Sequence, residues 1–273
     1  MIALLAPASS NAKVPTMKTK LWAATILMLV AACAAPPPTT SQRTPPPTAA
    51  PHDALPQPTA WRAVLVAGDD QEPAFDNAVD AMARKLTALG VPRSSVVILK
   101  ANGENEQEGT AANIAGAFDR LAPAAATDGC FVFVTSHGAP ARGLVMKHAR
   151  AFLSPANLDR LLAGPCQGRP TVVIASGCYS GSFTEGAMPA SNRVILTAAR
   201  DDRPSFGCNA SRQFTVFDQC ILDSIVAGSR WWTVMENART CIDENERALH
   251  VDAPSEPQTS IGAQVTDLRV LSP

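Results

Sequence analysis

Short apolar runs that alternate with amphipathic segments constrain this fold more than any other feature of the sequence. The runs cover residues 63–67, 96–99, 131–134, 171–175 and 194–196. Runs this short that are bounded by turn residues are typical of buried strands. The segments 74–89, 110–121 and 154–162 carry apolar residues at helical spacing. Strands that alternate with helices predict one α/β domain, residues 61–273, with a mostly parallel sheet covered on both faces.

The later part of the chain adds further elements to this pattern. Residues 212–227 and 231–248 have the composition of two more helices, and residues 143–153 are mixed enough for a small hairpin. Ser154 followed by Pro155 is a helix start, because proline suits the first helical position. The tail after Pro254 can add one last short strand.

The N-terminus resembles a targeting segment rather than part of the domain. Residues 17–20 are basic, and residues 21–32 carry no charge. This run is shorter than the roughly 20 residues that a membrane-spanning helix needs. The tetrad Val30–Cys33 resembles a bacterial lipoprotein signal, which implies a signal peptide over residues 1–33, with Met17 as an alternative start, and a lipidated Cys33. An ordinary cleaved signal with an incidental cysteine is the alternative.

Residues 34–60 form a stretch rich in proline, threonine and alanine. Proline stiffens such a tether toward polyproline II, so it would hold the following domain away from a membrane. We therefore expect an exported protein, anchored by lipid to the bacterial outer membrane, whose domain faces the periplasm or the cell surface.

The charge balance excludes some classes of partner. The chain has 23 basic and 24 acidic residues, for a formal net charge of −1. Nothing in this balance favours nucleic acid as a partner. No cofactor is expected either.

Two reactive side chains follow consecutive apolar runs. His137 comes shortly after the third run, and Cys178 comes shortly after the fourth. The carboxyl ends of parallel strands form the usual site of an open α/β sheet, so neighbouring strands would bring both side chains into one crevice. An imidazole there raises the thiolate fraction of a thiol whose pKa is ordinarily about 8.5. This pattern predicts Cys178 as nucleophile and His137 as general base.

The surroundings of Cys178 fit the same chemistry. The backbone amides of Cys178 and Gly138 are the natural candidates for an oxyanion hole, and Gly138 has no side chain to obstruct a substrate carbonyl. A helix start near residues 181–183 would favour the thiolate through its dipole.

Other interpretations of these residues remain open. An inert buried cysteine and a structural histidine are common in proteins. A zinc site of His137, Cys130, Cys166 and Cys178 is another possibility, although no C-x-x-C or H-x-x-x-H pair supports it. An α/β-hydrolase would need glycines where Ser176 and Ser180 stand, and a histidine such as His250. A catalytically silent lipoprotein that binds peptides or partners is the third alternative.

Several segments resemble the legumain-type cysteine peptidases, in particular bacterial lipoprotein-type members. Residues 131–140 (FVFVTSHGAP) and 172–183 (VVIASGCYSGSF) look like the His-Gly and Cys motifs of that family. Residues 63–70, 75–86, 153–162 and 197–208 resemble it as well, so the likeness runs from about Trp61 to Gln258. The resemblance implies a caspase-like three-layer sandwich. It also implies a cysteine endopeptidase that acts on peptides or proteins through a thioester, with His137 and Cys178 in the catalytic roles.

The sequence departs from that family where the substrate side chain binds. Plant and animal members carry basic residues after the first strand, whereas this chain has Phe75, Asp76 and Asn77 in a loose alignment. We count Asp76, Asn77 and Ser176 as candidate substrate-binding residues. A carboxylate at Asp76 would favour a cationic side chain just before the cleaved bond.

The family also places a third residue behind the catalytic histidine. Asp69, Asp70 and Asn77 are the candidates for this position, and the sequence does not decide between them.

The remaining cysteines suggest disulfides, which an exported chain can form. Cys130 and Cys166 precede the third and fourth runs, so neighbouring parallel strands would place both at the amino edge of the sheet, within disulfide range. Cys220 and Cys241 are a weaker second pair, which leaves Cys208 free. Buried thiols are the alternative for the first pair.

Overall fold

The structure is a computed structural model that describes residues 54–103, 107–122, 125, 127–208 and 212–271. The chain divides into two units, residues 1–43 and 44–273, and the description below concerns the second. The expected signal peptide, Cys33 and most of the expected tether lie outside the described residues. Of the described helices, none is long and apolar enough to cross a membrane.

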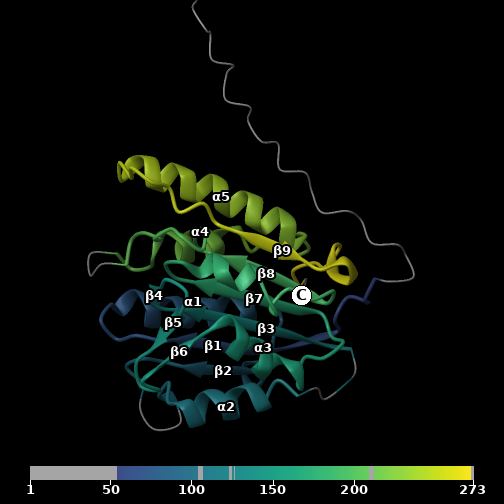
Figure 1. Ribbon diagram of the computed structural model, residues 1–273. Coiled ribbons are helices and arrows are strands. Elements are labelled where there is room, and N and C mark those ends of the chain that lie inside the picture. The colour runs from purple at the N-terminus through teal and green to yellow at the C-terminus, as the bar shows by residue number, and fades with distance from the viewer. Residues whose placement is uncertain (1–53, 104–106, 123–124, 126, 209–211, 272–273) are drawn as a thin grey trace, which may run out of the picture. The chain divides into compact units, whose positions relative to one another are not determined.

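A sheet of mostly parallel strands forms the centre of the domain (Figure 1). Its strand order is β2-β1-β3-β7-β8-β9, and only β9 pairs antiparallel. All five predicted strands are present, and the tail contributes the sixth. The strands are β1 (Ala60–Ala67), β2 (Val96–Leu99), β3 (Asp128–Thr135), β7 (Thr171–Ser176), β8 (Arg193–Thr197) and β9 (Thr259–Ile261).

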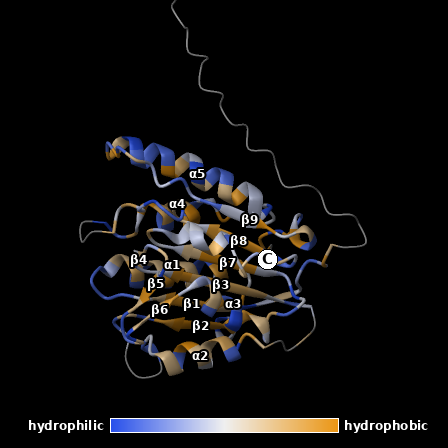
Figure 2. Ribbon diagram, viewed as in Figure 1, coloured by the Kyte–Doolittle hydropathy of each residue, from blue (hydrophilic) through white to orange (hydrophobic). Residues whose placement is uncertain are grey.

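Helices cover both faces of the sheet and give the domain three layers. One apolar core joins the sheet to α1 (Pro73–Ala88), α4 (Val216–Ser224) and α5 (Trp231–Ala248). A second core joins the other face to α2 (Ala111–Asp119) and α3 (Pro155–Ala163). Figure 2 shows mostly hydrophobic strands in the sheet, whereas α5 alternates hydrophobic and hydrophilic residues as a surface helix does.

The ends of the helices follow local capping chemistry. The hydroxyls of Thr110 and Ser154 accept the amides of Asn113 and Asn157, each at 3.2 Å, as N-caps of α2 and α3. The helix predicted over residues 212–227 is shorter, because the Thr215 side chain caps it and α4 begins at the next residue.

Short strands and 3₁₀ turns also occur among the described residues. β4 (Gly138–Ala139), β5 (Gly143–Met146) and β6 (Ala151–Leu153) form a small antiparallel sheet, which includes the predicted hairpin. The turns are η1 (Arg93–Ser95), η3 (Ser180–Thr184) and η4 (Ala263–Val265).

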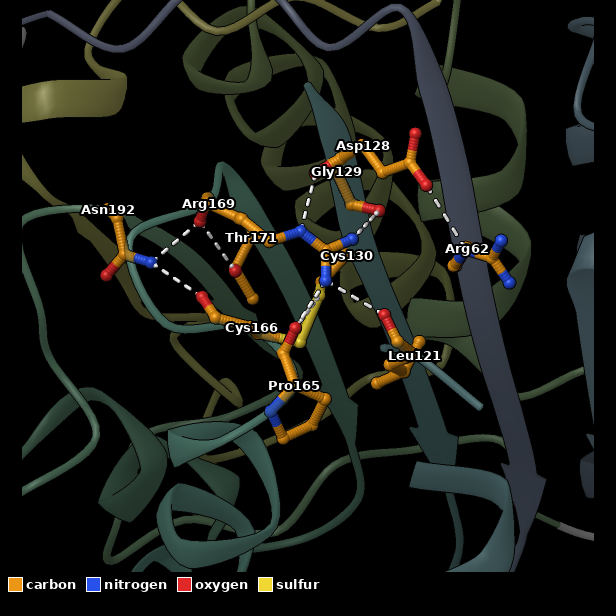
Figure 3. Close-up of a disulfide and its surroundings, with 10 residues drawn as sticks. All are labelled: Arg62, Leu121, Asp128, Gly129, Cys130, Pro165, Cys166, Arg169, Thr171 and Asn192. Carbon is orange, nitrogen blue, oxygen red and sulfur yellow. Dashed lines mark hydrogen bonds and ion pairs between the residues drawn. A yellow bond between two sulfur atoms is a disulfide. The ribbon is translucent and has the colours of Figure 1, made fainter. Parts of the chain in front are cut away.

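A disulfide and a buried arginine fasten the amino edge of the sheet (Figure 3). Cys130 and Cys166 are bonded with a Cα–Cα distance of 6.0 Å, which is the pairing that the sequence favours. The Arg169 guanidinium donates to the carbonyls of Asp128 at 2.7 Å and Leu121 at 2.8 Å. Because these bonds join the starts of β3 and β7 to the end of α2, they fix the edge opposite the strand carboxyl ends.

Two further features concern the helical layer and the entry of the chain. A second disulfide joins Cys220 of α4 to Cys241 of α5. The first described residues lie along the amino edge, where the Leu55 amide donates to Gln264 at 2.8 Å and the Thr59 amide to Thr127 at 3.2 Å. The chain therefore enters the domain at the disulfide-bonded edge.

Candidate catalytic site

The register of β3 and β7 places His137 beside Cys178. Thr135 pairs with Ser176 at the carboxyl ends of these parallel neighbours. The Ser136 amide donates to the Ser176 carbonyl at 3.0 Å, which continues the ladder beyond the strands. His137 and Cys178 each lie two residues past the last pair, so their backbones occupy equivalent positions on adjacent loops.

Both side chains are half-buried, and their contacts lie on the α1 and α4 side of the sheet. The His137 ring meets the Phe75 ring of α1 edge-on, with centroids 5.1 Å apart. The Cys178 sulfur accepts the Ser205 amide at 3.3 Å, and Phe206 packs against the α1–α4 core. No hydrogen bond joins the thiol to the imidazole within the described part of the chain, which is common for such pairs before substrate binds.

The loops that carry His137 and Cys178 touch through their backbones. A Cβ atom at Gly138 would lie 1.9 Å from the Cys178 carbonyl oxygen. A Cβ atom at Gly177 would lie 2.6 Å from the Ser136 carbonyl oxygen. Because any side chain at these positions would force the loops apart, the two glycines permit the close approach of the loops.

The amides expected to form an oxyanion hole are available. The Val145 amide donates to the His137 carbonyl at 2.8 Å, and Gly138 pairs with Leu144 across β4 and β5. Directly opposed residues of an antiparallel ladder alternate between hydrogen-bonded and non-hydrogen-bonded pairs. The bond from Val145 to His137 shows that Gly138 and Leu144 are a non-hydrogen-bonded pair, so the Gly138 amide donates to no residue of β5. Among the described residues, the Cys178 amide also has no backbone acceptor.

None of the three candidates for a third catalytic residue is hydrogen bonded to His137 among the described residues. Asp69 accepts the Gln71 amide at 2.9 Å. Asp70 pairs with Lys147, whose ammonium holds the pKa of that carboxyl below its usual range. Asn77 donates to the Gln213 carbonyl at 3.1 Å. The ring of His137 instead contacts Phe75, so packing orients it in this structure.

Asp76 faces the end of β2 rather than the catalytic loops. Its two carboxylate oxygens accept the amides of Ala101 at 3.0 Å and Asn102 at 3.2 Å. β1 lies between β2 and β3, so these partners are on the far side of β1 from His137. The contacts favour a structural role for Asp76, and its predicted role in substrate recognition stays a prediction.

A buried carboxyl group, which sequence analysis missed, lies beneath the catalytic loops. Asp218 of α4 is fully buried, and its Oδ2 accepts the Thr135 hydroxyl at 2.7 Å. Burial raises the pKa of Asp218 to about 6, although the hydroxyls of Ser176, Thr135 and Thr215 oppose that shift. Ser176, a candidate substrate-binding residue, is itself buried beside this carboxyl. The sequence signal that could have indicated this buried carboxyl group is that Asp218 is the one acidic residue in the mostly apolar segment 214–222.

The loop that follows β8 supplies further neighbours of Cys178. The Ser205 hydroxyl lies 3.7 Å from the Cys178 sulfur, in addition to the amide contact. Cys208 is a free, half-buried thiol. Burial raises its pKa, and the negative charge of a Cys178 thiolate raises it further. These contacts could not be read from the sequence, because no periodic pattern places this loop against Cys178.

The expected helix start after Cys178 is not an α-helix. η3 is a five-residue 3₁₀ turn, and Tyr179 precedes it in the left-handed region at φ 61°. The Tyr179 amide donates to the Arg203 carbonyl at 2.8 Å, which directs the chain sharply away from β7. A turn this short provides little helix dipole, so the prediction that a helix dipole favours the Cys178 thiolate is wrong.

The structure overturns the zinc alternative. Cys130 and Cys166 are consumed by a disulfide at the opposite edge of the sheet from His137 and Cys178. No cluster of three or more potential metal ligands occurs among the residues that the structure describes.

Comparisons with known proteins agree with this geometry. The model of the Peptidase C13 family matches residues 105–231, a span that contains both motifs. The crystal structure of caspase-1 from Spodoptera frugiperda aligns with a TM-score of 0.58 at 13% identity, over 83% of this chain and 97% of that one. At this identity the likeness shows a caspase-like fold, which is not that of an α/β-hydrolase. No curated protein sequence matches the chain significantly.

Proposed function

We propose that the chain is a cysteine-type peptidase of the legumain family and that it cleaves peptide bonds with Cys178 as nucleophile and His137 as general base. The observation that carries this proposal is the shared register of β3 and β7, which brings the thiol and the imidazole to the same edge of the sheet. Its substrates are peptides or proteins.

The geometry supports a two-step reaction. His137 takes the proton of the Cys178 thiol, and the thiolate attacks the carbonyl carbon of the peptide bond. The amides of Cys178 and Gly138 donate to the oxyanion that forms. His137 then protonates the departing amine, which leaves an acyl group on the sulfur as a thioester. Water activated by His137 hydrolyses the thioester and returns the proton to the thiol.

Substitution of the two catalytic residues tests this assignment. Cys178→Ala should remove cleavage of a peptide library, and His137→Ala should lower kcat/KM by roughly 10²–10⁴-fold. A thiol-reactive peptide probe should label the native chain and not Cys178→Ala. Labelling at Cys208 instead of Cys178, or full cleavage by Cys178→Ala, would refute the mechanism.

We further propose that the protein is exported and anchored through a lipid on Cys33. The support is the tetrad Val30–Cys33, which ends in this cysteine, and the proline-rich stretch that follows it. Residues 55–59 lie at the amino edge, so a tether that joins the domain there leaves the carboxyl edge open to substrates. Mass spectrometry of the mature protein should find an acylated Cys33 at its N-terminus, and a mature start beyond Cys33 would contradict this.

A further inference from the structure

A groove is lined by residues of the small β4–β5–β6 sheet and of the helices α2 and α3. Figure 1 shows where these elements lie in the domain. Its apolar part has a volume of about 380 Å³ and its basic part about 510 Å³. Met146, Ala151, Phe152 and Asn157 line both parts, so the two form one continuous hollow. We call it the hairpin groove, and the side chains that define it are Ile114, Arg142, Arg150, Phe152, Arg160 and Leu161.

The hairpin groove carries positive charge that the protein does not neutralise. Arg142, Arg150 and Arg160 are exposed, and none forms an ion pair with a carboxylate among the described residues. The Arg142 guanidinium stacks on the Phe152 ring at 4.1 Å, which holds it over the groove. Arg160 is oriented by the Asn157 side chain.

Nearby acidic side chains are already engaged. Asp70 pairs with Lys147, and Glu108 contacts His148 at 2.6 Å. Asp159 of α3 pairs with Arg193 at 2.6 Å. The three groove arginines therefore remain available for an outside carboxylate, and a guanidinium can bind one through two parallel hydrogen bonds.

The groove begins at the catalytic loop. β4 starts at Gly138, directly after His137, and the Arg142 amide donates to the Ala139 carbonyl at 3.1 Å. Val145, whose amide bonds to the His137 carbonyl, lines the basic part of the groove. The His137 and Cys178 side chains contact the α1 and α4 side of the sheet, whereas the groove lies on the α2 and α3 side. A polypeptide held at Cys178 would therefore reach the groove by crossing the carboxyl edge beside this hairpin, as an extended chain that advances about 3.3 Å per residue.

We propose that the hairpin groove binds a segment of the protein substrate some residues away from the cleaved bond, and that this segment combines carboxylates with large apolar side chains. The arginines would bind the carboxylates, while Ile114, Phe152 and Leu161 would bury the apolar side chains. This inference rests on the proposed peptidase function and adds a preference to it that lies outside the catalytic loops.

Direct binding separates the inference from catalysis. The test uses the full chain with Cys178→Ala and two fluorescein-labelled peptides, one alternating glutamate with leucine and one alternating lysine with leucine. Fluorescence anisotropy should show the glutamate peptide binding at least tenfold tighter, with the advantage shrinking as salt is added. Equal affinity for the two peptides would overturn the proposal.

Substitutions then locate the binding site. The pair Arg142→Gln and Arg160→Gln should weaken binding of the glutamate peptide about tenfold or more. Arg84→Gln, at an exposed arginine of α1 outside the groove, is the matched control and should leave binding unchanged. The reversed pair Arg142→Glu and Arg160→Glu should instead favour the lysine peptide, and an unchanged preference in this variant would also count against the groove.

Cleavage measurements separate the peptidase proposal from the groove inference. A substrate selected from a peptide library is extended with either the glutamate or the lysine segment on each side of the cleaved bond. If the catalytically intact chain cleaves no peptide of the library, the peptidase proposal fails, and the anisotropy result alone decides whether the groove binds the glutamate peptide. If it cleaves both extended substrates with equal KM, the peptidase proposal holds and the groove inference is wrong.

Discussion

The α-carbon of Gly138 lies so close to the carbonyl oxygen of Cys178 that a Cβ there would be only 1.9 Å from this oxygen. The residue after the proposed base thus contacts the backbone of the proposed nucleophile. Each loop leaves a strand that is buried in the sheet. The site is therefore positioned by two central strands rather than by a mobile surface loop.

Gly138→Ala tests this contact. The added methyl group must displace the Cys178 carbonyl and the neighbouring amides, so kcat/KM should fall by roughly a hundredfold or more. Circular dichroism and thermal melting should show that the domain still folds. Gly116→Ala is the control, because nothing lies within 4 Å of a Cβ at that exposed position of α2. It should keep full activity and gain about 1 kcal/mol of stability.

The disulfide at the amino edge should stabilise the fold without affecting catalytic activity. Replacing Cys130 and Cys166 together by serine should cost about 4 kcal/mol, given the 36-residue separation that the bond closes. Activity should persist below the lowered melting temperature, because the catalytic loops lie at the opposite edge. Replacing Cys220 and Cys241, separated by only 21 residues, should cost less. Peptide mapping without reductant checks the pairing, and free alkylation of Cys130 would contradict it.

Asp76→Asn separates a structural role from a role in specificity. The Asp76 carboxylate accepts two backbone amides after β2, so its loss should lower stability by about 1–2 kcal/mol. On this basis the side-chain preference before the cleaved bond should not change. Asp80→Asn, one turn later on α1, is a control that removes a carboxylate which, among the described residues, accepts a hydrogen bond only from the Lys100 side chain, at 2.7 Å. A lost preference for cationic side chains in Asp76→Asn alone would restore the prediction made from sequence.

Periodicity in the sequence was enough to predict the sheet and the edge at which Cys178 and His137 meet. Strand ends follow directly from where an apolar run stops, and parallel neighbours align those ends. Contacts made by loops could not be predicted in this way. Ser205 reaches Cys178, and Asp76 turns toward β2, because of tertiary hydrogen bonds that leave no local pattern.

The same limit explains the misjudged turn after Cys178 and the missed carboxyl of Asp218. The small residues after Cys178 suit a helix start and a 3₁₀ turn equally well, and the bond from Tyr179 to Arg203 decides between them. Asp218 stands within an apolar helical run, and only the packing of α4 on the sheet shows that it lies beneath Thr135.

Asp218 should make stability depend on pH. Burial raises its pKa from 3.8 to about 6 in the folded chain, so the folded state favours the protonated carboxyl. The stabilisation that the protonated Asp218 gives the folded state is fully present below about pH 4. It is lost as the pH rises through about 6, which lowers the free energy of unfolding by roughly 3 kcal/mol in total. Asp218→Asn, which can still accept the Thr135 hydroxyl, should remove this loss and be the more stable protein at pH 7.

Urea denaturation of native protein and variant at pH 4 and pH 7 measures the difference. Glu246, whose pKa burial also raises, remains in both proteins, so its contribution cancels in the comparison. Asp119→Asn, at an exposed position at the end of α2, should retain the pH dependence of the native chain. If Asp218→Asn also loses stability between pH 4 and pH 7 to the same extent as the native chain, then Asp218 is ionised without penalty, and the burial argument for its raised pKa is wrong.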